Sequence, residues 1–401
     1  MKFPSAEEYF RRIHRIMQLL DEDNIRIISA LNELGPRNLQ LIARELKMPY
    51  PTLYSRVARL KEENVLHIWC NPNYSRIGLT RGMVLVDPLP GKELLVREAL
   101  RIPNYWIKLI RCMGECNGYY SLHAVPTLHL REFEEYIDQF IPLGLASDCR
   151  VSWFEDQHTF IPNFEYYDTA SRMWKFPWAT WVNLLANGSN DSTTENRLVS
   201  SPRTVSFDTR DLYVMKELHK DASVKLADIA RMFGITLPAA KYRFESVMKK
   251  GLTSEYVFDI LPYAPEMSEL YEVMLDFKTD SGLRSSSRKL AKLPFVLSLS
   301  KFKGLSSLAA RIYLPRGEMN NLIAMLSVLV REGILTNFTS LWLDPLTLKS
   351  QTFSFEKYRE GFGWDYDNNE YNEALHNLLS SFTKRTYNET SFEPMPTVTL
   401  Q

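Results

Sequence analysis

Apolar residues recur at helical spacing in two short segments near the start of the chain, between residues 39 and 65. The first apolar stripe consists of Leu39, Ile42, Ala43 and Leu46, and the second of Leu53, Val57 and Leu60. We predict two more helices upstream, at residues 5–20 and 21–34, and a short wing strand at residues 66–70. This order is typical of a winged helix-turn-helix domain.

The second helix of this motif carries polar and basic side chains on its outer face. They are Thr52, Tyr54, Ser55, Arg56, Arg59 and Lys61. A helix that enters a major groove needs cations for the phosphates and hydrogen-bonding groups for the base edges. We therefore predict contacts with double-stranded DNA. A solvated amphipathic helix carries the same residue types, so this stretch alone leaves both interpretations open.

From residue 81 the hydrophobic pattern changes. Strand-like segments lie at residues 83–88, 105–114, 118–126 and 149–156, and helix-like segments at residues 90–100 and 128–144. The order strand, helix, strand, strand, helix, strand is that of a ferredoxin-like domain. An aromatic stretch that includes Trp181 follows, and we expect it to cover a sheet or an interface. The polar segment after it indicates a linker.

The same pattern restarts after this linker. Asp208 follows Asp21 by 187 residues, and Ile229 follows Ile42 by the same number. We predict that the second recognition helix contacts DNA through Lys241, Tyr242, Arg243, Ser246, Lys249 and Lys250. Dimeric DNA-binding proteins present two recognition helices about one helical turn of DNA apart. Here a single chain can supply both, as an intramolecular pseudo-dimer.

The predicted fold class is α+β, with two winged helix-turn-helix domains and two βαββαβ ferredoxin-like domains in tandem repeat. We expect the first half to consist of an N-terminal helix with a winged helix-turn-helix domain (1–76), a ferredoxin-like domain (77–155), and an aromatic tail with the polar linker (156–205). The second half repeats them as a winged helix-turn-helix domain (206–262), a ferredoxin-like domain (263–346) and an aromatic C-terminal tail (347–401).

Composition supports a globular chain of several domains. The chain has 401 residues, of which 45% are hydrophobic and 24% are charged, and its 48 basic residues balance its 48 acidic residues. This balance excludes a protein coated in basic charge, but DNA-binding proteins often confine their cations to one face. With neither a signal segment nor a membrane-spanning run in the sequence, we expect a cytoplasmic protein that has no membrane partner.

Candidate chemistry is sparse. Cys112 and Cys116 lie four residues apart, but they lack the paired C-x2-C spacing of a zinc site, so we expect no metal. The nucleotide-binding loop, the serine-hydrolase elbow, the zinc-protease motif and the dinucleotide fingerprint are all absent from the sequence. We therefore predict no catalytic residues and no cofactor, and we predict that the chain is not an enzyme.

The run from Met48 to Leu66 (MPYPTLYSRVARLKEENVL), with Ile77-Gly78-Leu79 on the linking strand, resembles the leucine-responsive (Lrp/AsnC) transcription regulators of bacteria and archaea. Its most specific part is Pro-Thr-x-x-x-Arg-Val-x-x-Leu, residues 51–60. The resemblance implies a sequence-specific DNA-binding transcription regulator, and it allows a homodimer and a small-molecule effector such as an amino acid. By position, the effector-binding residues would be Gly114, Glu115, Asn117 and Gly118.

Two alternatives belong to other functional classes. Siroheme decarboxylases resemble these regulators in fold and domain order, and that resemblance implies a role for His123 and His129 at the carboxylates of a tetrapyrrole. In the second copy Ile312 replaces His123. Alternatively, the winged helices bind other proteins rather than DNA, which a neutral total charge favours.

Overall fold

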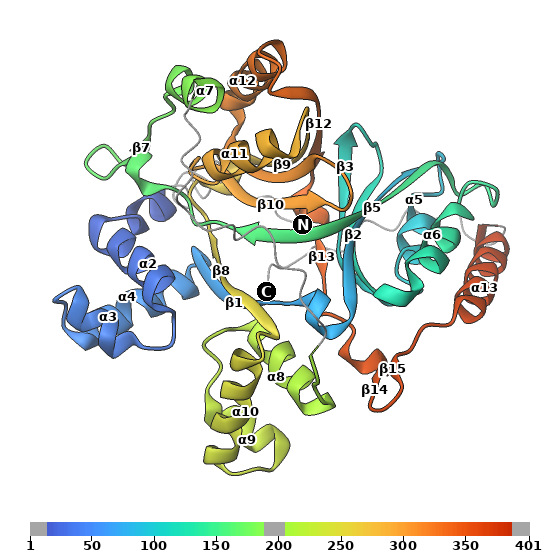
Figure 1. The fold of residues 1–401 in the computed structure, drawn as a ribbon, viewed down its shortest axis with the longest axis horizontal. Helices are drawn as coiled ribbons and strands as arrows, with labels where there is room; N and C mark the ends of the chain where they lie inside the picture. Colours follow the sequence, from blue (N-terminus) through green and yellow to red (C-terminus); the bar gives the residue numbers. More distant parts are fainter. Residues whose placement is uncertain (1–13, 188–204, 387–401) are drawn as a thin grey trace. The chain divides into compact units, whose positions relative to one another are not determined.

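A computed structural model describes residues 14–187 and 205–386, and its fold is α+β, as the sequence predicted (Figure 1). The structure divides into two compact units. Of the described residues, unit 1 comprises 14–72, 156–187 and 217–339, and unit 2 comprises 73–155, 205–216 and 340–386. In the described ranges, none of the helices combines the length and the apolar character needed to span a membrane.

The first helix-turn-helix domain lies in unit 1 and contains α2 (Glu22–Leu34), α3 (Leu39–Glu45) and α4 (Tyr50–Glu62). Asp21 caps α2, and the helix ends at Gly35, whose φ of 82° favours glycine. Pro51 sits in the first turn of α4, where a proline costs no helical hydrogen bond. The apolar stripes of the three helices face one core. Of the predicted upstream helix, residues 14–19 are helical, and its earlier part lies outside the described residues.

The second helix-turn-helix domain contains α8 (Thr209–Lys220), α9 (Leu226–Phe233) and α10 (Leu237–Lys249). Each of these helices begins 187 residues after its counterpart in the first domain (209 after 22, 226 after 39 and 237 after 50). Thr236 caps α10 through a hydrogen bond from the Ala239 amide, and Gly234 ends α9 in the left-handed conformation. The predicted second recognition helix is therefore α10.

A two-stranded ribbon connects the helix-turn-helix domains within unit 1. It consists of β1 (Leu66–Pro72) and β8 (Thr253–Ile260), which pair antiparallel (Figure 1). The predicted wing strand is thus β1, and its partner is a strand that begins 187 residues later. Trp69 pairs with Val257, and Cys70 pairs with Tyr256. Because Tyr256 and Val257 are the counterparts of Trp69 and Cys70, the register is that of two equivalent strands related by a two-fold axis.

Unit 1 also contains the second ferredoxin-like sheet. Its strands are β9 (Ser268–Phe277), β10 (Val296–Phe302), β11 (Ser307–Pro315) and β12 (Leu335–Leu343), in the order β12-β9-β11-β10. The helices of the motif are α11 (Asp280–Leu290) and α12 (Met319–Arg331). Leu322, Met325, Leu326 and Leu329 form the buried stripe of α12. The split βαβ order predicted for this half is therefore present.

Unit 2 contains the first ferredoxin-like sheet. Its strands are β2 (Leu79–Pro88), β3 (Trp106–Gly114), β4 (Tyr119–Pro126), β5 (Ala146–Thr159) and the short β13 (Lys349–Ser350), in the order β5-β2-β4-β3-β13. Its helices are α5 (Glu93–Ala99) and α6 (Leu130–Asp138). Gly82 must lack a side chain, because a Cβ there would lie 2.6 Å from the ring of Trp153 on the paired strand. The elements β5, α8 and β12 cross from one unit to the other.

Short 3-10 helices connect these elements. They are η1 (Tyr74–Ile77), η2 (Thr127–His129), η3 (Phe164–Tyr166), η4 (Pro265–Met267), η5 (Arg316–Glu318), η6 (Pro345–Thr347) and η7 (Phe355–Lys357).

The aromatic tails are crossed between the two halves of the sequence. The first tail contains β6 (Tyr167–Asp168), β7 (Met173–Trp174) and α7 (Trp178–Asn187), and it packs in unit 1 against the second ferredoxin-like domain. The indole of Trp178 stacks on Phe295 at 5.3 Å and donates to Glu318 Oε2 at 2.7 Å. The expectation that these aromatic residues cover a protein surface agrees with these contacts.

The second tail contains β14 (Tyr358–Arg359), β15 (Gly363–Trp364) and α13 (Asn368–Thr386), and it packs in unit 2. There α13 contacts α5 and α6 of the first ferredoxin-like domain (Figure 1). Gln139 Nε2 donates to Asn372 Oδ1 at 3.0 Å, and Asn104 Nδ2 donates to Glu356 Oε1 at 3.0 Å. Each tail thus completes the ferredoxin-like domain of the opposite half.

Trp181 provides a test of this crossed packing. It is fully buried in α7, and Phe295 of the opposite half meets it edge-on at 5.4 Å. We expect Trp181→Ala to lower the free energy of unfolding by about 3–5 kcal/mol, because truncating a buried tryptophan leaves a cavity. Trp181→Phe, which keeps an aromatic ring at this position, should cost less. Urea denaturation of the two variants measures both values, and equal, negligible losses would contradict the packing.

Candidate functional site

The outer face of α4 presents most of the side chains predicted for the first DNA contact. Thr52, Ser55 and Arg59 are exposed, and Tyr54 has 57% of its surface open to solvent. Tyr54 lies beside Tyr50, with ring centroids 6.2 Å apart. These four side chains lie on the face opposite the buried residues Leu53, Val57 and Leu60 of the same helix. A macromolecular partner such as a DNA duplex can reach all four side chains.

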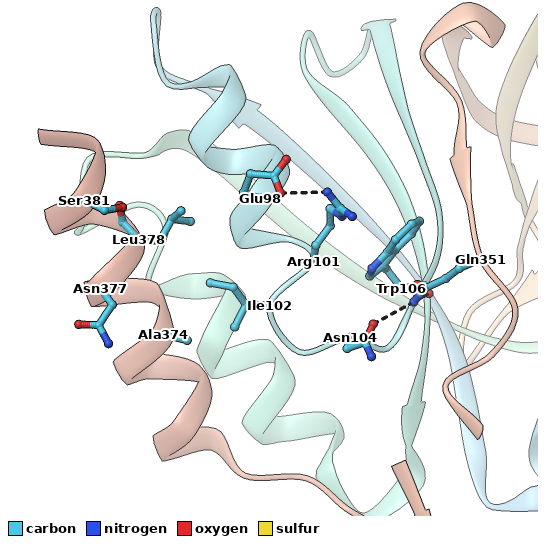
Figure 2. A pocket seen from close by; sticks show the side chains of 10 residues that line it. All are labelled: Glu98, Arg101, Ile102, Asn104, Trp106, Gln351, Ala374, Asn377, Leu378 and Ser381. Carbon is cyan, nitrogen blue, oxygen red and sulfur yellow. Dashed lines mark hydrogen bonds and ion pairs between the residues drawn. The ribbon is translucent and has the colours of Figure 1, made fainter. Parts of the chain in front are cut away.

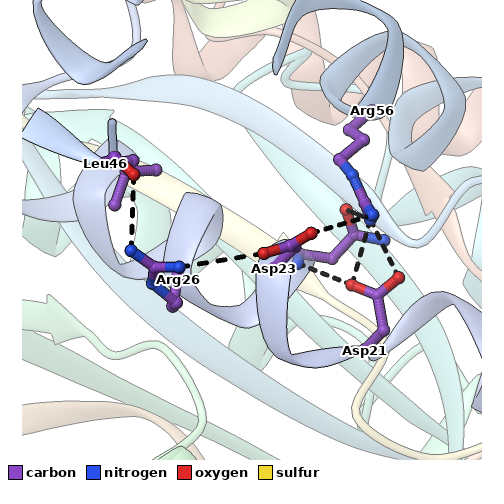
Figure 3. Close-up of polar contacts among 6 residues, drawn as sticks. Asp21, Asp23, Arg26, Leu46 and Arg56 are labelled. Atoms are coloured by element: carbon purple, nitrogen blue, oxygen red, sulfur yellow. Dashed lines mark hydrogen bonds and ion pairs between the residues drawn. The ribbon is translucent and has the colours of Figure 1, made fainter. Parts of the chain in front are cut away.

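Arg56 is engaged inside its own domain (Figure 3). Its Nη1 lies 2.8 Å from Asp21 Oδ2, and its Nη2 lies 3.0 Å from Asp23 Oδ2. Nη1 also donates to the side-chain oxygen of Asn24 at 3.1 Å. The guanidinium therefore joins α4 to the first turn of α2, where acidic residues are also favoured by the helix dipole. This contact serves the packing of the domain.

Lys61, the last cation predicted on α4, points to the second helix-turn-helix domain. Its Nζ lies 2.6 Å from Ser223 Oγ and 3.7 Å from Asp221 Oδ1. Both partners belong to the loop between α8 and α9. The structure thus separates the predicted set on α4 into four exposed side chains and two, Arg56 and Lys61, that hold protein contacts.

On α10, Lys241, Tyr242 and Lys249 are exposed, and Tyr242 is open over 74% of its surface. Lys241 Nζ lies 3.8 Å from Glu245 Oε1, a spacing at which an exposed ion pair contributes little. The remaining predicted residues, Arg243, Ser246 and Lys250, are half-buried. The second recognition helix therefore also has a cationic outer face, with its two most exposed lysines eight positions apart.

The turn predicted to bind an effector is closed by its own contacts in unit 2. The carboxylate of Glu115 accepts from Arg150 Nη1 at 2.8 Å. The backbone amide of Asn117 donates to Asp87 Oδ1 at 2.6 Å. A Cβ on Gly118 would lie 2.2 Å from Val86 O, and a Cβ on Gly114 would lie 2.6 Å from Ser340 O. These glycines serve close backbone approach, so sterics explain both of them without a ligand.

A pocket of about 570 Å³ lies elsewhere in unit 2, and sequence reasoning missed it (Figure 2). Its lining comes from the stretch between the end of α5 and the start of β3 and from the second tail: Glu98, Arg101, Ile102, Asn104, Trp106, Gln351, Ala374, Asn377, Leu378 and Ser381. The guanidinium of Arg101 lies 5.3 Å from the Trp106 ring centroid and 2.9 Å from Glu98 Oε2. The volume of the pocket is within the range of small-molecule sites, and its lining is both polar and apolar. The two groups of lining residues lie about 250 positions apart, which hid the pocket from sequence patterns.

The two candidate histidines have different surroundings. His123 is fully buried on β4, where its Nε2 lies 2.9 Å from Ser121 Oγ and its ring packs against Phe133. Burial lowers the pKa of His123 to about 3, so the ring is neutral at ordinary pH. His129 is partly exposed and stacks on Tyr366 of the second tail at 4.9 Å and 11°. Its Nδ1 lies 3.3 Å from Glu132 Oε1.

Cys112 and Cys116 are both buried free thiols of unit 2. Cys116 Sγ lies 3.4 Å from Val86 O, and its contact with Cys112, together with burial, raises its pKa. Among the residues that the structure describes, no group of three or more histidine, cysteine or acidic side chains could hold a metal ion.

His123 should make the free energy of unfolding decrease in acid. Because its pKa in the folded state, about 3, lies below the ordinary value of 6.5, its contribution is complete above pH 6.5 and is lost as the pH falls toward 3. The expected loss is about 1.4 kcal/mol for each pH unit in that window. Denaturant melts at several pH values measure it.

The chain itself supplies the control for this experiment. At the equivalent positions of β11, Ala310 and Ile312 replace Ser121 and His123. A Ser121→Ala, His123→Ile double variant should unfold with a weaker pH dependence than the unmodified protein. If both proteins lost stability in parallel between pH 6.5 and 4, His123 would not be the group responsible.

Comparison with known proteins gives structural neighbours only. No protein-family model and no curated protein matches the chain. The crystal structure of the siroheme decarboxylase NirDL is similar over 94% of this chain and 99% of that chain, at 12% identity and a TM-score of 0.47. The structure of the same enzyme with an iron-uroporphyrin III analogue covers 93% and 99%, at 13% identity and a TM-score of 0.47. AsnC of E. coli covers 37% of this chain and 99% of its own, at 17% identity and a TM-score of 0.28.

These neighbours include Lrp/AsnC regulators, which match about a third of the chain each. They also correct one prediction. We predicted from the absence of catalytic motifs that the chain is not an enzyme, and that prediction is wrong as it stands, because the neighbours that match over nearly the full length are structures of an enzyme. The absence of these motifs was a poor basis for the prediction, because the motifs considered belong to other folds and other chemistries.

Proposed function

We propose that the chain binds double-stranded DNA in the cytoplasm as a sequence-specific transcription regulator, using α4 and α10 as two recognition helices of an intramolecular pseudo-dimer. The observation that carries this proposal is the register of the β1–β8 ribbon, in which Trp69 pairs with the counterpart of Cys70 (Val257), and Cys70 pairs with the counterpart of Trp69 (Tyr256). Two chains of a symmetric dimer pair equivalent strands in this way. The tandem duplication of an Lrp/AsnC-like unit, with the domain boundaries expected from the sequence, is part of the proposal.

The charge on the two outer faces supports the same function. Arg59 on α4 and Lys241 and Lys249 on α10 are exposed, and they belong to helices whose other faces are buried. Exposed cations on a helix gain little from isolated ion pairs, but each one that neutralises a phosphate releases a condensed counterion. The zero net charge of the whole chain is compatible with this placement, because two acidic residues of the first domain, Asp21 and Asp23, pair with the half-buried Arg56.

Removing the exposed cations tests DNA binding. We expect the triple variant Arg59→Ala, Lys241→Ala, Lys249→Ala to bind duplex DNA more weakly. It should also reduce the slope of log K against log salt by about 1 for each cation that contacts a phosphate. Fluorescence anisotropy between about 50 and 200 mM salt gives both quantities.

A matched control removes three exposed cations from the ferredoxin-like domains: Lys92, Arg131 and Arg331. This variant should keep the salt slope of the unmodified protein. Equal losses in the two triple variants would show that the interaction follows overall charge and would contradict groove insertion. Arg56→Ala is unsuitable as a test of contact, because it also removes the ion pairs to Asp21 and Asp23.

A second function is favoured by His129 and Tyr366. We infer that, if the chain acts on siroheme as its full-length neighbours do, His129 supplies the proton. Decarboxylation breaks the bond between a methylene carbon and its carboxylate, carbon dioxide leaves, and the carbon takes up a proton. His129 is partly exposed, and its ring is oriented by the face of Tyr366 and by Glu132. A general acid positioned in this way contributes roughly 10²–10⁴-fold to a rate.

Iron-uroporphyrin III serves as the probe for this second function. Binding should change the visible absorbance of the porphyrin, and His129→Ala should weaken that change or abolish turnover of siroheme. His376→Ala, at an exposed position on α13, is the control and should do neither. If the unmodified protein leaves the porphyrin spectrum unchanged at all concentrations, the second function is eliminated.

A further inference from the structure

The two helix-turn-helix domains are joined by more than the β1–β8 ribbon. The first domain holds the loop between α8 and α9, residues 221–224, with one arginine. Arg37 Nη1 donates to Ala222 O at 2.8 Å, and Nη2 donates to Val224 O at 3.0 Å. The guanidinium also lies 4.4 Å from the ring centroid of Phe244 on α10. One side chain thus contacts the loop and the second recognition helix together.

Two further side chains of the same half hold this loop. Lys61 Nζ binds Ser223 Oγ, and His67 Nε2 donates to Lys220 O at 2.8 Å. The amide of Ala222, which is fully buried, donates to Ile68 O on β1 at 2.9 Å. The loop is therefore attached to the ribbon and to the first domain at Ala222, Ser223 and Val224, and His67 holds Lys220, the last residue of α8.

These side-chain contacts are made by the first helix-turn-helix half to the second, and they have no equivalent in the opposite direction. The residues 187 positions after Arg37, Lys61 and His67 are Val224, Met248 and Ser254, which carry no charge. The second domain therefore cannot return the same contacts to the first. We call the contacts of Arg37, Lys61 and His67 with residues 220–224 the clamp. The clamp departs from the two-fold relation of the ribbon, because all three side chains belong to the first half of the sequence.

We propose that Arg37 is a positioning residue, which fixes the orientation of the second helix-turn-helix domain relative to the first and so sets the spacing between α4 and α10. Its importance for recognition rests on the proposed function of DNA binding. An antiparallel pair of strands by itself twists readily and is only marginally stable. The planar fork of an arginine holds two carbonyl oxygens in fixed directions, which a lysine cannot do. Arg37 thus restrains the rotation that the ribbon would allow.

The full chain can report this spacing directly through two spin labels. Gln40 on α3 and Ala227 on α9 are exposed equivalent positions, 187 residues apart, and each can be replaced by cysteine for labelling. The half-buried Cys149 is replaced by serine, because the other three cysteines are buried. Double electron–electron resonance on the DNA-free protein should give one narrow distribution of distances.

Arg37→Ala should broaden or shift that distribution while the circular dichroism spectrum stays unchanged. Arg37→Lys, which keeps the charge but loses the fork, should broaden it as well. Arg44→Ala, at an exposed position on α3, is the matched control and should leave it narrow. If the alanine variant does not fold, the lysine variant decides the question. A distribution that stays narrow in a folded Arg37 variant would overturn the proposal.

A second measurement connects the clamp to recognition. Duplexes that carry two copies of a selected half-site, with centres varied around about 10 base pairs, should bind the unmodified protein best at one spacing. Arg37→Ala should lose most of that preference, and the Arg44→Ala control should retain it. If the unmodified protein binds none of these duplexes, the proposed function fails, and the distance measurement still decides whether Arg37 is a clamp.

Discussion

The antiparallel pairing of β1 with β8 is the interaction on which the rest of this account depends. Each strand leaves one helix-turn-helix domain, and their backbone hydrogen bonds form without reference to side-chain identity. This explains how a ribbon can keep a two-fold register between segments as different as LHIWCNP and TSEYVFDI. Hydrophobic residues on one face, among them Leu66, Ile68 and Phe258, are buried and prevent the register from slipping by one residue.

The crossed aromatic tails also join the two halves of the sequence, through side-chain packing. An aromatic tail buries large rings only where a complementary surface exists, and here that surface belongs to the ferredoxin-like domain of the opposite half. Neither half of the sequence would therefore complete its own ferredoxin-like domain. The pocket beside Arg101 and Trp106 arises from this exchange, since its remaining lining comes from α13 and Gln351. Segments from the two halves of the sequence thus form one pocket.

Much of the fold could be predicted from the sequence, because its elements depend on local patterns. The stripe of Leu53, Val57 and Leu60 marked α4, and the constant offset of 187 residues located α8, α9 and α10. The strand order of both ferredoxin-like domains followed from changes of period. The pairing of β1 with β8 could not be predicted, since strand partners far apart in sequence leave no periodic signal.

The candidate sites were harder to predict than the fold. Arg56 has the residue type and helical position of a groove contact, yet its guanidinium is held by Asp21 and Asp23, which precede it by more than thirty residues. Glu115 and Asn117 have the chemistry of a ligand site, yet Arg150 binds the Glu115 carboxylate, and the side-chain oxygen of Asn117 accepts from the Gly114 amide. Arg37 gave no motif at all, because its partners are backbone carbonyls. Sequence shows which side chains are present, and tertiary contacts determine which remain available.

Recovery of bound fragments from a pool of random duplexes, followed by footprinting on the enriched sequence, tests the central claim most directly. If one chain presents two recognition helices as a dimer does, the enriched DNA should contain two related half-sites, protected about one helical turn apart by a single polypeptide. Enrichment of one isolated half-site, or of no sequence at all, would contradict the account.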